Sequence, residues 1–423
     1  MINNIKKIIK NKTFKNSIWL MILQFANTII PLLTIPYITR VLGAEQYGLF
    51  SIALNWILYF QVIVEFGFGL SGARKVAILK NQNDLNKLFN NILSSRILLC
   101  IITFILLNFI SIISSLNRDT YICMLLLYLM VLGTTFQLTW LFQGKQDMKF
   151  ITIINSISRI VSVLLIFVFI KNKSDVFLYC ILYSITLFLS SIISIFVANK
   201  KYNLKFEFSK LDDIKNEIKD GTHLFYSSAM TKIFSGFGVT ILGIFSSSYI
   251  TGIYSAIYKV PYILTMIFSP ISQAIYPYSS QKMTKSFSEG EKSIKKIAIP
   301  IFSIFVFIAI VIIGLRKFII ELLFGKEYIE YSIIIIPLII QFLFAIVNNF
   351  LGIQTLVSSG HQKNYSKAFS IGCFFTIVLN ILLGRYFKIY GVAYAAMIGE
   401  AILFASLLFQ INKIRKENKY EKD

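Results

Sequence analysis

Residues 297–315 read IAIPIFSIFVFIAIVIIGL, a run of 19 residues without a charged side chain. A helix of this length rises about 30 Å, which is the thickness of the hydrocarbon core of a bilayer. Inside such a core every backbone amide and carbonyl must find a partner within the protein, and a helix satisfies them within one segment. The stretch therefore predicts a membrane-spanning helix.

Comparable apolar runs recur along the whole chain. Of its 423 residues, 56% are hydrophobic and only 15% are charged, whereas soluble domains carry about 25% charged residues. The charged residues gather between the apolar runs. We therefore predict an all-α polytopic membrane protein with twelve transmembrane helices, at 16–38, 47–70, 89–114, 120–142, 150–170, 176–198, 221–246, 250–274, 295–315, 331–358, 365–383 and 391–411.

The formal net charge of +22 is explained by membrane topology. With twelve helices, the side of the membrane that holds both termini carries 29 lysines and arginines, and the opposite side carries 9. Lysine and arginine accumulate in cytoplasmic loops, so both termini are expected in the cytoplasm. No nucleic-acid partner is needed to account for the charge.

The longest polar connection divides the predicted helices into two sets of six. We expect an N-terminal six-helix bundle at 1–198, a cytoplasmic linker at 199–220, a C-terminal six-helix bundle at 221–412 and a basic cytoplasmic tail at 413–423. The second helix of each half opens with a similar sequence, GLFS at 48–51 and GIYS at 252–255, which favours a duplication. Two halves in the same orientation predict a cavity between them near the membrane midplane.

Four cations fall inside the predicted helices. Arg159 and Lys232 lie too deep to reach water easily, and Lys259 stands two residues before Pro261, where a disturbed backbone ladder admits water. Arg96 lies nearer the cytoplasmic end of its helix, so it either extends to the interface or faces a cavity. A cavity lined by these cations suits an anionic, phosphate-bearing substrate.

Two carboxylates are also intramembrane, Glu65 and Glu400. They either pair with two of the cations to hold helices together or bind a proton or sodium ion coupled to transport. Amides within the helices are candidates for contacts with sugar hydroxyls or with neighbouring helices. These amides are Asn155, Gln341, Asn348, Asn349 and Asn380.

Other motifs do not indicate a cofactor or a metal. Residues 67–72 fit G-x-G-x-x-G, but they end a predicted membrane helix and no strand precedes them. There is no Walker lysine motif. The four cysteines are scattered singly, and His223 and His361 have no companions at metal-ligand spacing.

Five short stretches carry a family likeness. They are Pro36 to Gly48, Phe66 to Arg74, Trp140 to Gly144, Gly252 to Lys259 and Gly360 to Tyr365. In type and order these residues resemble bacterial polysaccharide repeat-unit flippases, within the multidrug/oligosaccharidyl-lipid/polysaccharide exporter (MOP) superfamily. The matching motif positions are Pro36, Arg40, Gly43, Gly48, Arg74, Trp140 and Gly144. Similar proteins often carry an acid beside the arginine that corresponds to Arg74, where this chain has Lys75.

The resemblance implies a MATE-like fold and a transporter rather than an enzyme. It implies transfer of an undecaprenyl-diphosphate-linked oligosaccharide from the cytoplasmic to the outer leaflet of the bacterial inner membrane, by alternating access. The glycan would belong to an O-antigen, capsule or teichoic-type polymer, with glycosyltransferases and a polysaccharide polymerase as candidate partners. The diphosphate suits the surplus of intramembrane cations.

Two alternatives stay open. A cation-coupled drug or small-metabolite antiporter of the same architecture would use Glu65 and Glu400 as its coupling acids. A membrane polysaccharide polymerase or ligase would need an active site on the outer face. Its weakness is that the outer loops are short, the longest being about 316–330.

Overall fold

The computed structural model describes residues 12–113 and 117–420, and within these ranges the chain is helical with no strand. Some residues of the predicted topology lie outside the described residues. They are Lys6, Lys7 and Lys10 of the predicted cytoplasmic side and residues 421–423 of the predicted basic tail. The helices form two compact units. The first comprises the described residues up to Thr34 together with Val41–Lys232, and the second comprises Ile35–Arg40 together with the described residues from Ile233 onward.

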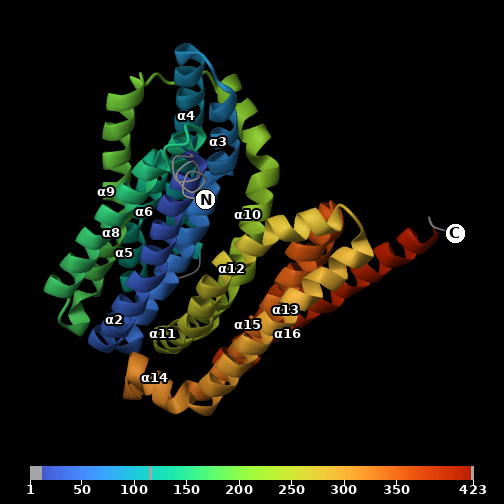
Figure 1. Ribbon diagram of the computed structural model, residues 1–423. Coiled ribbons are helices and arrows are strands. Elements are labelled where there is room, and N and C mark those ends of the chain that lie inside the picture. Colours follow the sequence, from blue (N-terminus) through green and yellow to red (C-terminus); the bar gives the residue numbers. More distant parts are fainter. Residues whose placement is uncertain (1–11, 114–116, 421–423) are drawn as a thin grey trace, which may run out of the picture. The chain divides into compact units, whose positions relative to one another are not determined.

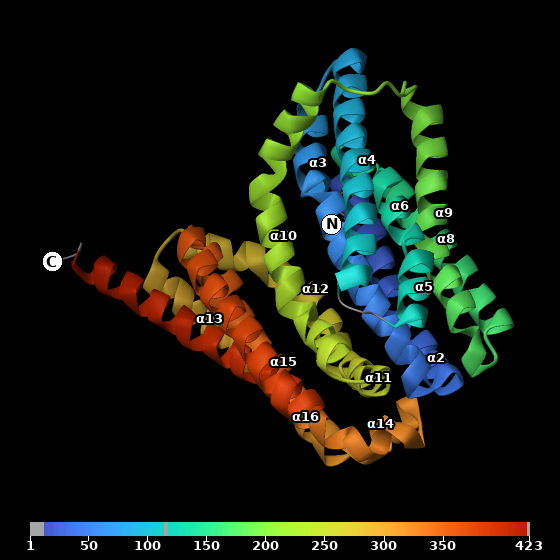
Figure 2. The same cartoon turned by 180° about the vertical axis from the view of Figure 1, so that it is seen from behind.

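The first unit is built from long helices and several shorter ones (Figure 1). Helices α8 and α9 lie side by side in it, in the front and the rear view (Figures 1 and 2). Its helices are α2 (Lys12–Glu65) without Ile35–Arg40, α3 (Phe68–Ile78), α4 (Gln82–Ile113), α5 (Arg118–Leu127), α6 (Leu129–Phe136), α7 (Thr139–Gly144), α8 (Met148–Phe169), η1 (Lys173–Asp175), α9 (Val176–Tyr202) and the start of α10 (Leu211–Phe245).

The second unit contains a π-helix and a long helical hairpin. Helices α15 and α16 lie side by side in it (Figures 1 and 2). After the end of α10 its elements are α11 (Ser248–Ile257), α12 (Lys259–Met283), α13 (Phe287–Gly314), α14 (Arg316–Phe324), the 3₁₀-helix η2 (Lys326–Ile334), α15 (Ile335–Leu351), the π-helix η3 (Gly352–Val357) and α16 (Gln362–Tyr420).

Helix α16 folds back on itself at Lys388, whose backbone is non-helical with φ 48° and ψ −124°. Asn364 donates a hydrogen bond to Gln410 at 3.0 Å, and Gly372 packs against Leu403. Both contacts join residues placed almost symmetrically about Lys388, so the two halves run antiparallel. In α2 the helical geometry is interrupted in the same way at Gly43, with φ 71° and ψ 170°.

Ten helical stretches among the described residues are long and apolar enough to cross a membrane. The prediction of an all-helical, multi-pass membrane protein is thereby confirmed. The count differs from the predicted twelve because α16 contains both 365–383 and 391–411, and α2 contains 16–38 with most of 47–70. The number of crossings thus depends on the breaks at Gly43 and Lys388.

The polar connection at 199–220 is mostly helical. Its first residues complete α9 and its last ten begin α10, so only 203–210 lies outside a helix. That segment is fastened to α4: the Glu207 amide donates to Asn90 Oδ1 at 3.1 Å, and the Ser209 hydroxyl donates to Asn91 Oδ1 at 2.7 Å. The connection therefore packs as part of the first unit.

Candidate functional site

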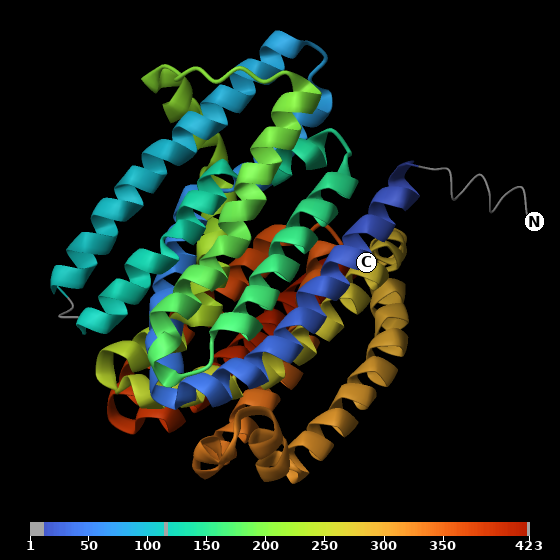
Figure 3. The ribbon, with the colours of Figure 1, turned by 90° about the vertical axis from the view of Figure 1, so that its left-hand side faces the viewer.

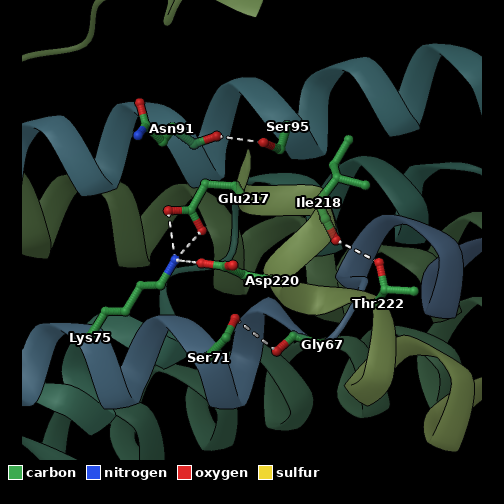
Figure 4. Close-up of polar contacts among 9 residues, drawn as sticks. All are labelled: Gly67, Ser71, Lys75, Asn91, Ser95, Glu217, Ile218, Asp220 and Thr222. Atoms are coloured by element: carbon green, nitrogen blue, oxygen red, sulfur yellow. Dashed lines mark hydrogen bonds and ion pairs between the residues drawn. The ribbon is translucent and has the colours of Figure 1, made fainter. Parts of the chain in front are cut away.

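Lys75 of α3 joins two acids of α10 (Figure 4). Its Nζ donates to both carboxylate oxygens of Glu217 and to Asp220 Oδ2, all at 2.9 Å. The Glu217 side chain is 8% exposed, and a buried carboxylate needs such a partner. Sequence reasoning noted Lys75 only as a departure from the family pattern. The signal it missed was the spacing of Glu217 and Asp220, which places both on one face of a helix.

A close backbone contact brings the start of α10 to this position. A Cβ on Gly221 would lie 2.5 Å from the carbonyl oxygen of Phe66, so only glycine allows this approach. The rings of Phe66 and Phe225 stack with centroids 4.3 Å apart. The G-x-G-x-x-G stretch thus begins in a turn between two helices, with Gly67 in the left-handed conformation at φ 76°.

Arg96 is buried, with 3% of its side chain exposed, and does not extend to the interface. Its Nη1 donates to the carbonyl oxygens of Thr134 at 3.2 Å and Gln137 at 2.8 Å, and its Nη2 lies 3.8 Å from Glu65 Oε1. Both carbonyls lie where α6 ends, and helix ends leave carbonyls unsatisfied. Arg96 therefore holds the break between α6 and α7 and links it to α2 and α4.

A hydrogen-bond network extends from this break to α8 and α9. Gln137 Nε2 donates to Asn155 Oδ1 at 3.1 Å and to Ser190 Oγ at 3.0 Å. Asn155 Nδ2 in turn donates to the Ile151 carbonyl at 2.8 Å, so both ends of its amide are used within the protein. The structure therefore brings together Glu65, Arg96 and Asn155, with Gln137 as the connecting residue that sequence reasoning missed.

The two deep cations of the first unit lie on α8 and α10. Arg159, in the middle of α8, and Lys232, in α10, are both half-buried. Lys232 is the last residue of the first unit along the chain. In the second unit Lys259 is half-buried at the start of α12, with its ammonium 5.5 Å from the centre of the Tyr262 ring.

Glu400 is buried in the second unit and is 7% exposed. Asn348 Nδ2 donates to its carboxylate at 2.7 Å and to its backbone carbonyl at 3.0 Å. No lysine or arginine of the described ranges forms an ion pair with it. Its surroundings thus differ from those of Glu65, which faces Arg96.

The remaining predicted amides have protein partners of their own. Asn349 Oδ1 accepts from Ser272 at 2.7 Å, Asn380 Nδ2 donates to the Thr376 carbonyl at 2.8 Å, and Gln341 lies beside Tyr258. The Oδ1 atoms of Asn348 and Asn380 are buried without a hydrogen-bond partner. The Oε1 atom of Gln341 is buried without a hydrogen-bond partner as well, so three amide oxygens of the second unit have capacity for a further ligand.

Several motif residues set the packing of helices. Trp140 of α7 is 1% exposed and covers Gly72 of α3, and Gly144 sits so close to α3 that a Cβ would lie 2.5 Å from Val76 Cβ. Gly48 is buried, Pro36 is half-buried and Arg74 is exposed. The Trp140 to Gly144 motif is therefore a helix-packing element.

Arg40 belongs to the second unit. Its guanidinium donates to the carbonyl oxygens of Glu321 at 3.2 Å and of Leu322, at the end of α14. Three residues later Gly43 adopts the positive φ that interrupts α2. Arg40 thus caps one helix, and Gly43 breaks another.

A polar cavity of about 570 Å³ opens beside the non-helical segment 203–210 of the first unit. Its lining is rich in amides and lysines, among them Asn83, Asn86, Lys87 and Lys205. None of the predicted site residues lines it. Among the described residues no cluster of histidine, cysteine, aspartate and glutamate is arranged to hold a metal ion.

Comparison with known proteins identifies the family of this chain. The family model described as polysaccharide biosynthesis protein matches residues 13–283. A protein named putative O-antigen transporter from Escherichia coli (strain K12) is 28% identical over 400 residues, covering 93% of this chain and 95% of its own length. The capsular polysaccharide biosynthesis protein CapF of Staphylococcus aureus is 26% identical over 65% of this chain and 70% of its own.

Solved structures share the fold at low sequence identity. The lipid II flippase MurJ in an inward closed conformation matches 94% of this chain and 87% of its own, with a TM-score of 0.67 and 17% identity. An inward-facing multidrug resistance MATE family transporter of the MOP superfamily matches 92% of this chain and 99% of its own, with a TM-score of 0.64 and 11% identity. The family model covers more than half of the chain, so the chain belongs to the family described as polysaccharide biosynthesis protein.

Proposed function

We propose that the protein is a flippase that moves undecaprenyl-diphosphate-linked oligosaccharide repeat units from the cytoplasmic to the outer leaflet of the bacterial inner membrane. The observation that carries this proposal is the match of nearly the whole chain to a protein named O-antigen transporter, within a polysaccharide biosynthesis family. The MurJ flippase supplies a precedent for moving a lipid-linked sugar with this fold. Glycosyltransferases would supply the substrate, and a polymerase would consume it.

In this proposal Arg159, Lys232 and Lys259 interact with the diphosphate during alternating access. Each is a half-buried cation on a helix long enough to span the membrane, and charge-assisted bonds to phosphate are strong. Moving negative charge outward across an inside-negative membrane is favourable by about 2.3 kcal/mol per charge per 100 mV. Arg96, also expected in this cationic site, is instead assigned to the α6–α7 break by its bonds to Thr134 and Gln137.

Glu400 is our candidate for coupling transport to a proton or sodium gradient. It is a buried carboxylate beside the unsatisfied Oδ1 of Asn348, and protonation or sodium binding would remove the cost of a buried charge. Glu65, paired with Arg96, is assigned to holding helices together.

The first test is to delete the gene in its own host and measure lipid-linked oligosaccharide by leaflet, with an impermeant reagent on intact cells and spheroplasts. We expect accumulation in the cytoplasmic leaflet that wild type relieves. The double variant Arg159→Ala, Lys232→Ala should slow transfer about tenfold, or ~1.4 kcal/mol in barrier height, because the diphosphate loses two cationic contacts.

A matched control removes two exposed lysines from the same helices, Lys149→Ala and Lys219→Ala. This control should transfer as well as wild type. Unchanged lipid-linked pools in the deletion strain would refute the flippase. Equal slowing by both double variants would refute the cationic site but not the flippase.

The second candidate function is a cation-coupled multidrug antiporter. The MATE-like fold and the buried Glu400 favour it. The same deletion strain separates the two functions, because an antiporter would alter sensitivity to a cationic drug and leave the lipid-linked pools unchanged.

A further inference from the structure

The second unit carries an apolar groove of about 230 Å³ between α13, α15 and η3. Its walls are formed by Ile294, Ala298 and Phe302 of α13, facing Val347, Phe350 and Leu351 of α15. The charged residues in its lining are Glu291 and Lys295, one turn apart near the start of α13. The groove therefore has a hydrocarbon interior and one charged mouth.

Two backbone irregularities shape the walls. Pro300 lies inside α13, where its ring removes a hydrogen bond and bends a helix, and α13 is curved along its length (Figure 3). On the other wall α15 continues into the π-helix η3, where the Thr355 hydroxyl donates to the Phe350 carbonyl at 2.9 Å. Such π-turns are rare and often mark functional sites.

The mouth carries a surplus of positive charge. Glu291 accepts hydrogen bonds from Arg415 Nε at 3.0 Å and from Arg415 Nη2, and it lies 3.2 Å from Lys295 Nζ. Lys292 and Lys296 are exposed on the same turns of α13. Both of these lysines lie outside the groove lining, so the mouth itself holds one carboxylate in contact with two cations, Lys295 and Arg415, and its net positive charge complements a phosphate group.

We propose that this groove binds the hydrocarbon chain of a polyprenyl carrier lipid, with the lipid phosphate at Lys295 and Arg415. The groove is smaller than the 300–1,000 Å³ typical of small-molecule pockets, so it takes part of one chain and no glycan. A single groove fits a single-chain polyprenyl lipid better than a phospholipid with two acyl chains. The proposal rests on the proposed function, because it names where the carrier of the oligosaccharide is held.

The test is native mass spectrometry of the full-length protein in detergent with added undecaprenyl phosphate or phosphatidylglycerol. Wild type should retain undecaprenyl phosphate at least about tenfold better than phosphatidylglycerol. Ala298→Trp, which fills the groove, should lose this retention. The control Ile310→Trp adds the same ring to an exposed position of the same helix, 64% exposed, and should bind like wild type.

A second pair of variants tests the mouth without altering the groove. Lys295→Gln should weaken retention of undecaprenyl phosphate several-fold, and Lys296→Gln, outside the lining, should not. Equal retention of both lipids, or full retention by Ala298→Trp, would overturn the proposal. A protein that transfers the oligosaccharide in the leaflet assay can still give either result, so the groove proposal can be refuted while the flippase proposal is kept.

Discussion

The two intramembrane carboxylates differ in what surrounds them. Glu65 lies 3.8 Å from a guanidinium nitrogen of Arg96, whereas buried Glu400 accepts a hydrogen bond from the neutral amide of Asn348. If Glu400 binds the coupling ion, Glu400→Gln should make oligosaccharide transfer insensitive to the proton or sodium gradient while keeping the contact with Asn348. The leaflet assay, run with each gradient collapsed in turn at constant membrane potential, measures this. Gradient dependence equal to that of wild type in Glu400→Gln would exclude Glu400 as the coupling group. Glu65→Gln is the matched control, and it should keep the gradient dependence and lose thermal stability, because buried Arg96 then lacks its countercharge.

At the scale of helices, glycines set the distance between α3 and α7. A Cβ at Gly144 would lie 2.5 Å from Val76 Cβ and 2.7 Å from the Ala73 carbonyl oxygen. Gly144→Ala should therefore push the two helices apart and lower the free energy of unfolding by about 1–3 kcal/mol, as overpacking does. Thermal unfolding of the purified protein in detergent measures the change. Gly314→Ala is the control, because nothing lies within 4 Å of its added Cβ, and it should leave the melting temperature unchanged or slightly higher. Equal melting temperatures for both variants would mean that the close contact of α3 with α7 contributes no stability.

At the scale of the whole molecule, the hairpin in α16 decides the topology. As one straight helix its 59 residues would extend about 88 Å, almost three times the hydrocarbon thickness. We propose that α16 crosses the membrane twice and that α2 does the same, which gives twelve crossings with both termini in the cytoplasm. Alkaline phosphatase fused after Lys173 or Lys388 should then be active, and fused after Lys205 or Asp423 it should be inactive. An inactive fusion after Lys388 would contradict the second crossing of α16.

The class of the protein and the approximate position of its helices follow from the amino-acid sequence alone. The runs at 89–114, 150–170, 176–198 and 295–315 each lie within a helix of the structure, or within its described part, apart from one residue at an end. Such predictions succeed because the length and apolar character of a membrane helix are local properties of the chain. Gly43 was named from sequence only as a motif position of the family resemblance, and its positive φ, which favours glycine, emerged from the structure.

The pairing of polar side chains, by contrast, depends on the packing of distant helices. Lys75 and Glu217 are 142 residues apart in the chain, Asn348 and Glu400 are 52 apart, and Arg96 and Gln137 are 41 apart. A sequence pattern shows that a buried charge needs a partner, but the partner depends on how helices pack, and packing is set by contacts between distant segments. The groove between α13 and α15 has the same origin, because its two walls come from separate helices whose facing sides no local pattern specifies.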